Sequence, residues 1–226
     1  MSYIRTRMNT LKYISNDVCA PSFESTIKEI KQMFKYLTFT HLPVVNNNQY
    51  MGSIAEKDIL FSENNDEKIQ SYFHLFEPFF ADEKMSWLEL LKNFATNDTN
   101  ILPIINKDKL YLGYYELNNI LHLFYETPFL NENGAIIIIE KDLKGYSFSE
   151  ISQIVESNDC NLLGMFISNV YDDKVQITLK MGYCNVASIS ETFSRYGYQL
   201  LTSFHDVESL ENLKDRSDYL QKYLNM

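Results

Sequence analysis

Two stretches of the chain repeat each other. The first, THLPVVN, occupies residues 40–46, and the second, NILPIIN, occupies residues 100–106, so that Pro43 and Pro103 take the same place in each. A glycine follows each run, Gly52 in the first and Gly113 in the second, at nearly the same distance along the chain. A repeat of this length indicates one supersecondary unit used twice, which constrains the fold more than any local pattern does.

Each repeat is expected to contain a helix, two short strands and the start of a second helix. In the first repeat, apolar residues follow helical spacing up to Tyr36, after a cap at Ser25 or Thr26 that Glu29 can complete as a capping box. Ser86 caps the equivalent helix of the second repeat. The strands are expected at residues 42–45, 50–54, 101–105 and 110–115.

Three connecting stretches are expected outside these elements. Residues 18–21 are predicted to form a short β segment. The polar residues 62–71, SENNDEKIQS, are predicted to form a linker or loop. Residues 127–134, TPFLNENG, contain Pro128, Asn133 and Gly134 and are expected to mark a boundary between domains.

The charge balance argues against a nucleic-acid partner. Acids outnumber bases 30 to 20, which gives a net charge of −10, whereas nucleic-acid binding needs a basic surface. The longest uninterrupted aliphatic run, residues 135–139, is far too short to span a membrane. The first residues lack the apolar segment of a secretory signal. We therefore expect a cytoplasmic protein with no membrane partner.

The cysteine and histidine positions give no metal or disulfide signature. The three cysteines are Cys19, Cys160 and Cys184, with no two close in sequence. The four histidines are scattered, and only His41 falls near a candidate ligand site. We expect no metal site and no catalytic residue, because no nucleophile–base pair or phosphate-binding loop emerges either.

Asp58 is the candidate binding residue. It lies six residues after Gly52, at the start of the second helix of the first repeat. A carboxylate at a helix N-terminus, beside a strand that permits close approach, can hold the hydroxyls of a sugar. The alternative is that Asp58 only stabilises the positive end of its helix.

The two repeats resemble a tandem pair of CBS domains, the regulatory modules named after cystathionine β-synthase. The resemblance covers about residues 8–126, as one unit at 8–62 and another at 72–126. It rests on the strand–proline–strand runs and on two stretches like G-x-x-[ST]-x-x-D, GSIAEKD and GYYELNN. The resemblance implies that the units pack as pseudo-twofold partners, that the clefts between them hold adenosine or its nucleotides, and that the module is not catalytic.

The departures from the family motif favour one cleft over the other. Ala55 and Glu116 replace the hydroxyl residue, and Asn119 replaces the acid of the second motif. Glu116 would repel a phosphate, and Asn119 offers only a neutral and weaker contact. A nucleoside is therefore expected beside Asp58. The residues expected to line that cleft are Thr40, His41 and Pro43.

The last third of the chain is expected to form a separate α+β domain at residues 134–206. Its predicted elements follow the order β-α-β-β-α-β of the ferredoxin-like split unit. The stretch IIIIEKDLKGYSFSEI, with Gly145 in the loop, resembles an ACT domain, which often binds amino acids at a dimer interface. The alternative is a pairing domain without a ligand. Residues 207–226 are expected to form a final helix with a leucine stripe.

The combination of a CBS pair with an ACT-like part resembles acetoin-utilisation accessory proteins. The leading hypothesis is a non-catalytic regulatory protein that senses adenosine, AMP or a related nucleotide, with no essential cofactor. The alternatives are a structural or dimerisation protein with degenerate clefts, or amino-acid sensing through the ACT-like domain. A homodimer is expected, because both modules pair through their faces and the chain holds 15 Phe and 16 Tyr, residues favoured at interfaces.

Overall fold

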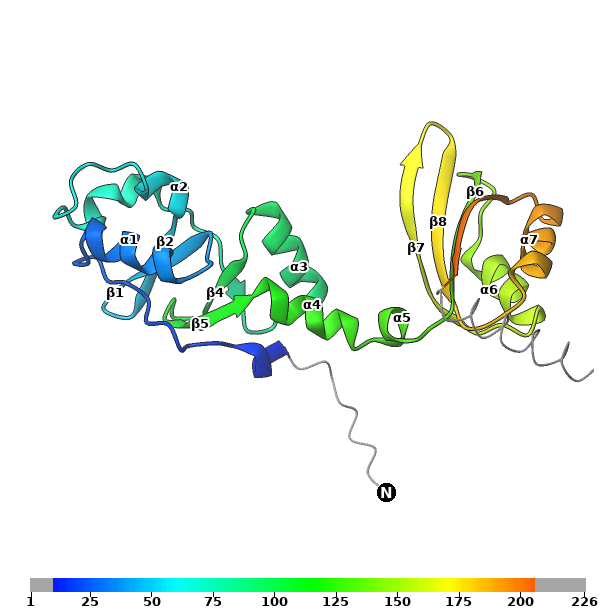
Figure 1. Ribbon diagram of the computed structural model, residues 1–226, viewed down its shortest axis with the longest axis horizontal. Helices are drawn as coiled ribbons and strands as arrows, with labels where there is room; N and C mark the ends of the chain where they lie inside the picture. The colour runs from blue at the N-terminus through cyan, green and yellow to red at the C-terminus, as the bar shows by residue number, and fades with distance from the viewer. Residues whose placement is uncertain (1–9, 206–226) are drawn as a thin grey trace, which may run out of the picture. The chain divides into compact units, whose positions relative to one another are not determined.

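The computed structural model describes residues 10–205, and the chain divides into two compact units at residues 124 and 125 (Figure 1). The fold class is mixed α and β, as predicted. The elements of the first unit are η1 (Thr10–Tyr13), α1 (Ile27–Tyr36), β1 (His41–Asn46), β2 (Gln49–Ala55), α2 (Glu56–Ile59), η2 (Ile69–Leu75), β3 (Ala81–Asp82), α3 (Trp87–Thr96), β4 (Ile101–Ile105), β5 (Tyr111–Glu116) and α4 (Leu117–Tyr125). The succession helix–strand–strand–helix occurs twice, which confirms the repeat.

Equivalent caps begin the first helix of each repeat. The Thr26 side chain accepts a hydrogen bond from the Glu29 amide, and Glu29 accepts one from the Thr26 amide. Ser86 and Glu89 form the same reciprocal pair at the start of α3. The predicted capping box at Thr26 and the predicted cap at Ser86 are confirmed, and Glu89 adds an unpredicted second half to the latter.

Residues 62–68 form a loop, as predicted, but the loop packs against the start of α1, and η2 begins at Ile69. The carbonyl oxygens of Asn65 and Glu67 accept hydrogen bonds of 2.9 Å from the free amides of Lys28 and Ile27 at the start of α1. Ile69, which begins η2, is fully buried in the core of the first repeat. The polar stretch therefore folds back and satisfies a helix end that would otherwise lack partners.

The segment before the first helix of each repeat pairs with a strand of the other repeat. Ser15, which lies before α1, exchanges two backbone hydrogen bonds of 2.9 Å with Tyr114 of β5. Glu77, which lies before α3, exchanges two backbone hydrogen bonds of 2.8 Å with Ser53 of β2. These crossing segments tie the repeats together. Residues 18–21 form no strand, but the end of this stretch pairs with β1: the Val45 amide donates to the Pro21 carbonyl oxygen at 2.9 Å, and Ser22 forms a parallel bridge with Val45.

Gly52 and Gly113 make room for the crossing segments. Their φ angles are +138° and +141°, which side-chain-bearing residues rarely adopt. A Cβ atom at Gly52 would lie 2.8 Å from the Cβ of Phe76, and one at Gly113 would lie 2.5 Å from the carbonyl oxygen of Ser15. The sequence predicted a close approach at Gly52 correctly, but the approaching group is the protein's own chain.

The second unit is a four-stranded antiparallel sheet with two helices on one face (Figure 1). Its elements are α5 (Pro128–Asn131), β6 (Ala135–Asp142), α6 (Phe148–Ser157), β7 (Leu162–Tyr171), β8 (Lys174–Met181), α7 (Val186–Arg195) and β9 (Gln199–His205). The strand order is β7-β8-β6-β9, and the predicted succession β-α-β-β-α-β is present. The expected helix at 207–226 lies outside the described residues.

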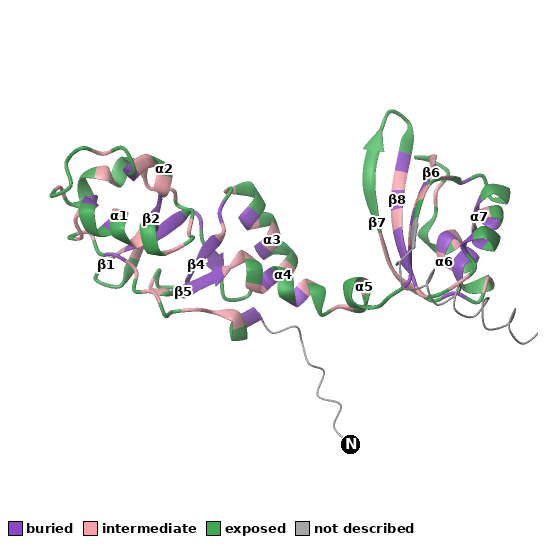
Figure 2. Ribbon diagram, in the orientation of Figure 1, coloured by how far each residue is buried: buried purple, intermediate pink, exposed green. Residues whose placement is uncertain are grey.

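The cores of the two units lie where apolar strand residues meet helices. In the second unit, alternate residues of β6 and β8 pack against α6 and α7, and the buried side of β8 stands out in Figure 2. The boundary at 127–134 contains an unpredicted short helix, because Pro128 takes the first helical position, where its missing amide proton costs nothing. Phe129 of this helix then packs against Phe166 of β7, with ring centroids 6.0 Å apart.

Replacing Gly113 with alanine should destabilise the first unit by roughly 1–3 kcal/mol, because the new methyl group meets backbone in a strained conformation. Gly145→Ala is the control, since a Cβ there would meet no atom closer than 3.6 Å. The single tryptophan, Trp87, lies in the first unit, so its fluorescence in urea reports that unit, while circular dichroism covers both. Equal stability of Gly113→Ala and wild type would contradict the close approach.

Candidate functional site in the seam between the repeats

Thr40 and Asn100 occupy equivalent positions and join the two repeats by reciprocal hydrogen bonds. The Thr40 amide donates to Asn100 Oδ1 at 2.9 Å, and the Asn100 amide donates to Thr40 Oγ1 at 3.1 Å. Asn100 Nδ2 also donates to the carbonyl oxygen of Thr38 at 2.5 Å. We call the set of contacts between the repeats the seam, and this pair lies where β1 and β4 begin.

The hairpin turns make a second reciprocal contact in the seam. The Tyr50 amide donates to the Lys109 carbonyl oxygen, and the Tyr111 amide donates to the Asn48 carbonyl oxygen, both at 3.0 Å. Tyr50 and Tyr111 are equivalent positions of the two repeats, as are Asn48 and Lys109. Asn48 and Lys109 have positive φ angles of +66° and +61°. The two hairpin turns therefore have the same backbone conformation at this position, although the second turn is one residue longer.

His41 lies buried beside the start of α2. Only 4% of the residue is exposed. Its Nδ1 is 2.9 Å from Thr40 Oγ1, and its Nε2 is 3.6 Å from Glu77 Oε1, beyond hydrogen-bond distance. When the Thr40 hydroxyl donates to Nδ1, the neutral ring carries its proton on Nε2. Nε2 then points toward Glu77 and has no hydrogen-bond partner among the described residues. The ring of Phe79 packs edge-on against the imidazole at 5.3 Å.

The charge of His41 depends on this environment. Burial away from water lowers the pKa of His41 from its ordinary value near 6.5, and this outweighs the raising effect of the Glu77 and Asp58 carboxylates. Lys57 lowers the pKa further. Asp58 is half-buried on α2, and the Glu56 amide donates to the Thr40 carbonyl oxygen at 2.9 Å, which holds the start of α2 at the seam.

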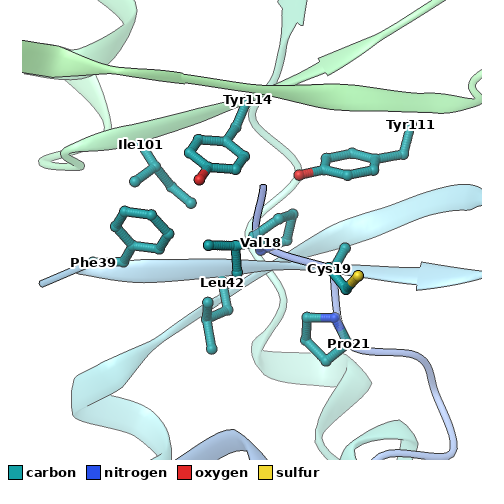
Figure 3. Close-up of a pocket in the computed structure, with 10 residues that line it drawn as sticks. Val18, Cys19, Pro21, Phe39, Leu42, Ile101, Tyr111 and Tyr114 are labelled. Carbon is teal, nitrogen blue, oxygen red and sulfur yellow. The ribbon is translucent and has the colours of Figure 1, made fainter. Parts of the chain in front are cut away.

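Tyr111 and Tyr114 line a hollow in the seam (Figure 3). Its empty volume, open space included, is about 180 Å³, and it is too narrow to admit a water molecule. Figure 3 shows both rings on the side of β5 where Val18 and Leu42 lie, and Pro43 lines the same hollow. The Tyr114 hydroxyl donates to Asp17 Oδ1 at 2.7 Å, and burial raises the pKa of Tyr114.

The structure separates the residues predicted to form one site. Thr40, His41 and Asp58 come together near Glu77, whereas Pro43 lines the hollow with Tyr114. Asn119 is half-buried on α4, in the second repeat, at the position equivalent to Asp58.

Sequence reasoning missed Glu77, Phe79, Asp17 and Tyr114. A usable signal was present for one of them. Tyr114 is the equivalent of Ser53 in the second repeat, so a large ring occupies the position of a small buried residue. At Ser53 the equivalent space is filled from another position, because the Tyr50 hydroxyl lies 2.8 Å from Ser53 Oγ.

Residues 14–64 match the CBS domain. This CBS domain spans the first repeat and the crossing segment before it. No curated protein matches the chain.

Solved structures similar to the chain include CBS domain pairs. One is a CBS domain pair/ACT domain protein from Thermotoga maritima, with 19% identity, 52% of this chain and 97% of that chain covered, and a TM-score of 0.46. Another is the pair domain of a Mg²⁺ transporter from Shewanella oneidensis, described as putative, with 16% identity, 54% and 72% covered, and a TM-score of 0.46. A third is the CBS domain of a bacterial CNNM/CorC family Mg²⁺ transporter in complex with ATP, with 16% identity, 50% and 83% covered, and a TM-score of 0.41.

Two features are absent from residues 10–205. No helix in this range is both long enough and apolar enough to cross a membrane. In the same range, no group of three or more His, Cys, Asp or Glu side chains is placed to hold a metal ion.

The first unit should lose stability as the pH falls below about 6.5, because His41 has a lower pKa in the folded protein than in the unfolded chain. The unfolded chain therefore protonates His41 first. The unfolded chain then binds more protons than the native chain, so the free energy of unfolding decreases until the native ring also protonates. His41→Gln should flatten this slope between pH 7.5 and 5.5, measured by urea unfolding with Trp87 fluorescence. The exposed His74→Gln variant is the control. An unchanged slope in His41→Gln would show that His41 does not carry the effect.

Proposed function

We propose that the first unit is a non-catalytic regulatory module that binds an adenosine-type ligand on the Asp58 side of the seam. Its two CBS units are residues 8–62 and 72–126. The observation that carries the proposal is the match of residues 14–64 to the CBS domain, together with a second copy of the same elements in the rest of the first unit. The CBS resemblance implies adenosine or its nucleotides as ligands.

The Asp58 side offers groups that suit a nucleoside. Asp58 is an ionised acceptor for a ribose diol. Nε2 of His41 supplies a buried polar atom without a hydrogen-bond partner among the described residues, and burying such an atom is unfavourable until a ligand satisfies it. Phe79 lies against the same imidazole, so an entering planar base would stack where this ring now packs.

The geometry favours adenosine or AMP over a triphosphate. The Glu56 amide at the start of α2 is already bonded to Thr40, and Ala55 at the cap has no side-chain hydroxyl to meet a phosphate. Glu56 and Asp58 add negative charge in the same turn. Additional phosphates would therefore gain little here.

A structural role is the second candidate, and one observation favours it. The hollow beside Tyr114 does not admit a water molecule, and aromatic rings fill both sides of the seam. Ligand sites usually enclose about 300–1,000 Å³. In this structural role, the clefts bind no ligand, and the first unit serves only in dimerisation or in contacts with other proteins.

For the second unit we propose a ferredoxin-like domain of the ACT type at residues 134–206. The strand order β7-β8-β6-β9 with both helices on one face supports this proposal. Such a domain would mediate pairing or sense an amino acid. The similarity of the whole chain to acetoin-utilisation accessory proteins remains part of the same proposal.

We also propose that the protein is a homodimer that pairs through the α1–α2 face of the first unit. Tyr36 and Phe61, at the ends of these helices, are 81% and 83% exposed. A hollow of about 300 Å³ lies between the same helices and is lined in part by Leu60. A chain with a net charge of −10 repels its copy unless apolar surface offsets the repulsion.

Asp58→Ala should weaken adenosine binding at least tenfold, because hydrogen bonds to an ionised acceptor contribute roughly 1.5–3 kcal/mol each. Asn119→Ala, the matched variant of the second repeat, should change affinity less than twofold. Isothermal titration calorimetry with adenosine, AMP and ATP measures both. Equal losses, or tight ATP binding lost in Asn119→Ala alone, contradict the assignment. Absence of binding by any of the three ligands favours the structural role.

Phe61→Asp should weaken dimerisation at least tenfold, because a charge would replace an aromatic side chain that the proposed dimer buries. Light scattering across micromolar concentrations should give twice 26.6 kDa for the wild type and a shift toward the monomer for this variant. Tyr183→Asp, at a 62% exposed position of the second unit, is the control. A wild type that is monomeric throughout would rule out the dimer, and equal weakening by both variants would rule out this face.

A further inference from the structure

Two cysteines that are distant in sequence meet in the second unit. Cys160 follows α6, and Cys184 precedes α7, so that the whole β7–β8 hairpin lies between them. Cys160 is 3% exposed and belongs to the core, and Cys184, half-buried, packs against the same core. The sequence showed no close pair, because folding rather than spacing brings the thiols together.

The backbone around the two thiols fixes their proximity. The Gly182 amide donates to the Asn161 carbonyl oxygen at 2.9 Å, which extends the β7–β8 ladder to the residues next to the cysteines. The Cys160 sulfur lies 3.8 Å from the Gly182 carbonyl oxygen, two residues before Cys184. Cys184 packs against the same core cluster to which Cys160 belongs, so the fold brings both thiols to one corner of the second unit.

We propose that Cys160 and Cys184 form a reversible redox site, at which a hydroperoxide converts the two thiols into a disulfide. This role is independent of ligand binding in the first unit. The third cysteine, Cys19, is exposed and belongs to the first unit, so it serves as an internal comparison.

The chemistry assigns a different step to each thiol. Hydrogen peroxide oxidises the more exposed Cys184 thiolate to a sulfenic acid and releases hydroxide. The Cys160 sulfur then attacks the Cys184 sulfur, which forms the S–S bond and expels water. In total, two thiols and one peroxide give one disulfide and two waters.

The environment of Cys160 explains this order. Burial, followed by the hydrogen bond with Cys184, raises the pKa of Cys160 to about 12. A thiol with such a pKa carries little thiolate at neutral pH, so Cys160 reacts slowly with peroxide itself, and the core also blocks its access to oxidant. Cys160 therefore takes the resolving step, in which its thiol proton leaves with the sulfenic hydroxyl group as water.

The bond would close the open end of the β7–β8 hairpin. It would link the α6–β7 junction to the β8–α7 junction and so hold both helices to the sheet. A crosslink stabilises a fold mainly because it limits the conformations of the unfolded chain. The oxidised second unit should therefore melt roughly 5 °C or more above the reduced unit, a shift that dithiothreitol reverses.

The test treats the full-length reduced protein with excess hydrogen peroxide, alkylates the remaining thiols and maps the peptides by mass spectrometry. The expected result is one intramolecular Cys160–Cys184 disulfide, with Cys19 either alkylated or oxidised on its own. Cys160→Ser should leave a sulfenic acid on Cys184 that dimedone traps, whereas Cys19→Ser should form the disulfide at the wild-type rate.

The wild-type map decides the matter even if a variant fails to fold. Free thiols on both Cys160 and Cys184 after treatment with excess peroxide would overturn the proposal. Disulfides that join Cys19 to another cysteine, or that join two chains through Cys184, would also overturn it.

Discussion

The reciprocal hydrogen bonds between Thr40 and Asn100 are the interaction on which the first unit depends. Each side chain satisfies the backbone amide of the other at the start of a strand. Neither repeat supplies this partner by itself, so each completes the other. The crossing segments at Ser15 and Glu77 reinforce the arrangement, because each adds backbone bonds to the strand of the opposite repeat. The two repeats therefore form one cooperative body rather than two independent modules.

The same interlocking makes the two sides of the seam unequal. On each side, a crossing segment lies against the strand glycine, Gly52 or Gly113. The size of the side chains beside that glycine therefore sets how much space the seam leaves on that side. On one side Tyr114 fills the space and donates to Asp17. On the other side the small Ser53 takes the equivalent place, and His41 and Phe79 occupy the room beside Asp58. A ligand on the Asp58 side would displace packed rings, whereas one on the Tyr114 side would have to replace part of the core.

Local signals in the sequence predicted most elements, and contacts between distant residues account for the failures. The capping box at Thr26, the cap at Ser86 and the strand pairs of both repeats rest on neighbours in sequence, so spacing was enough to place them. The role of residues 62–71 was missed because Asn65 and Glu67 use backbone oxygens, which carry no sequence signature. Pro43 was expected to line one cleft with His41, yet Pro43 lines the hollow with Tyr114, whereas His41 faces Glu77. The meeting of Cys160 and Cys184 depends on the hairpin between them and leaves no trace in their spacing.

A crystal structure of the full-length protein at saturating adenosine would show directly which side of the seam binds the nucleoside. We expect electron density for the nucleoside beside Asp58, with Phe79 moved from the imidazole of His41 and Tyr114 still bonded to Asp17. Density in place of the Tyr114 ring, with the Asp58 side unchanged, would contradict binding at Asp58. Density on neither side would contradict it as well and would leave the seam with a structural role only.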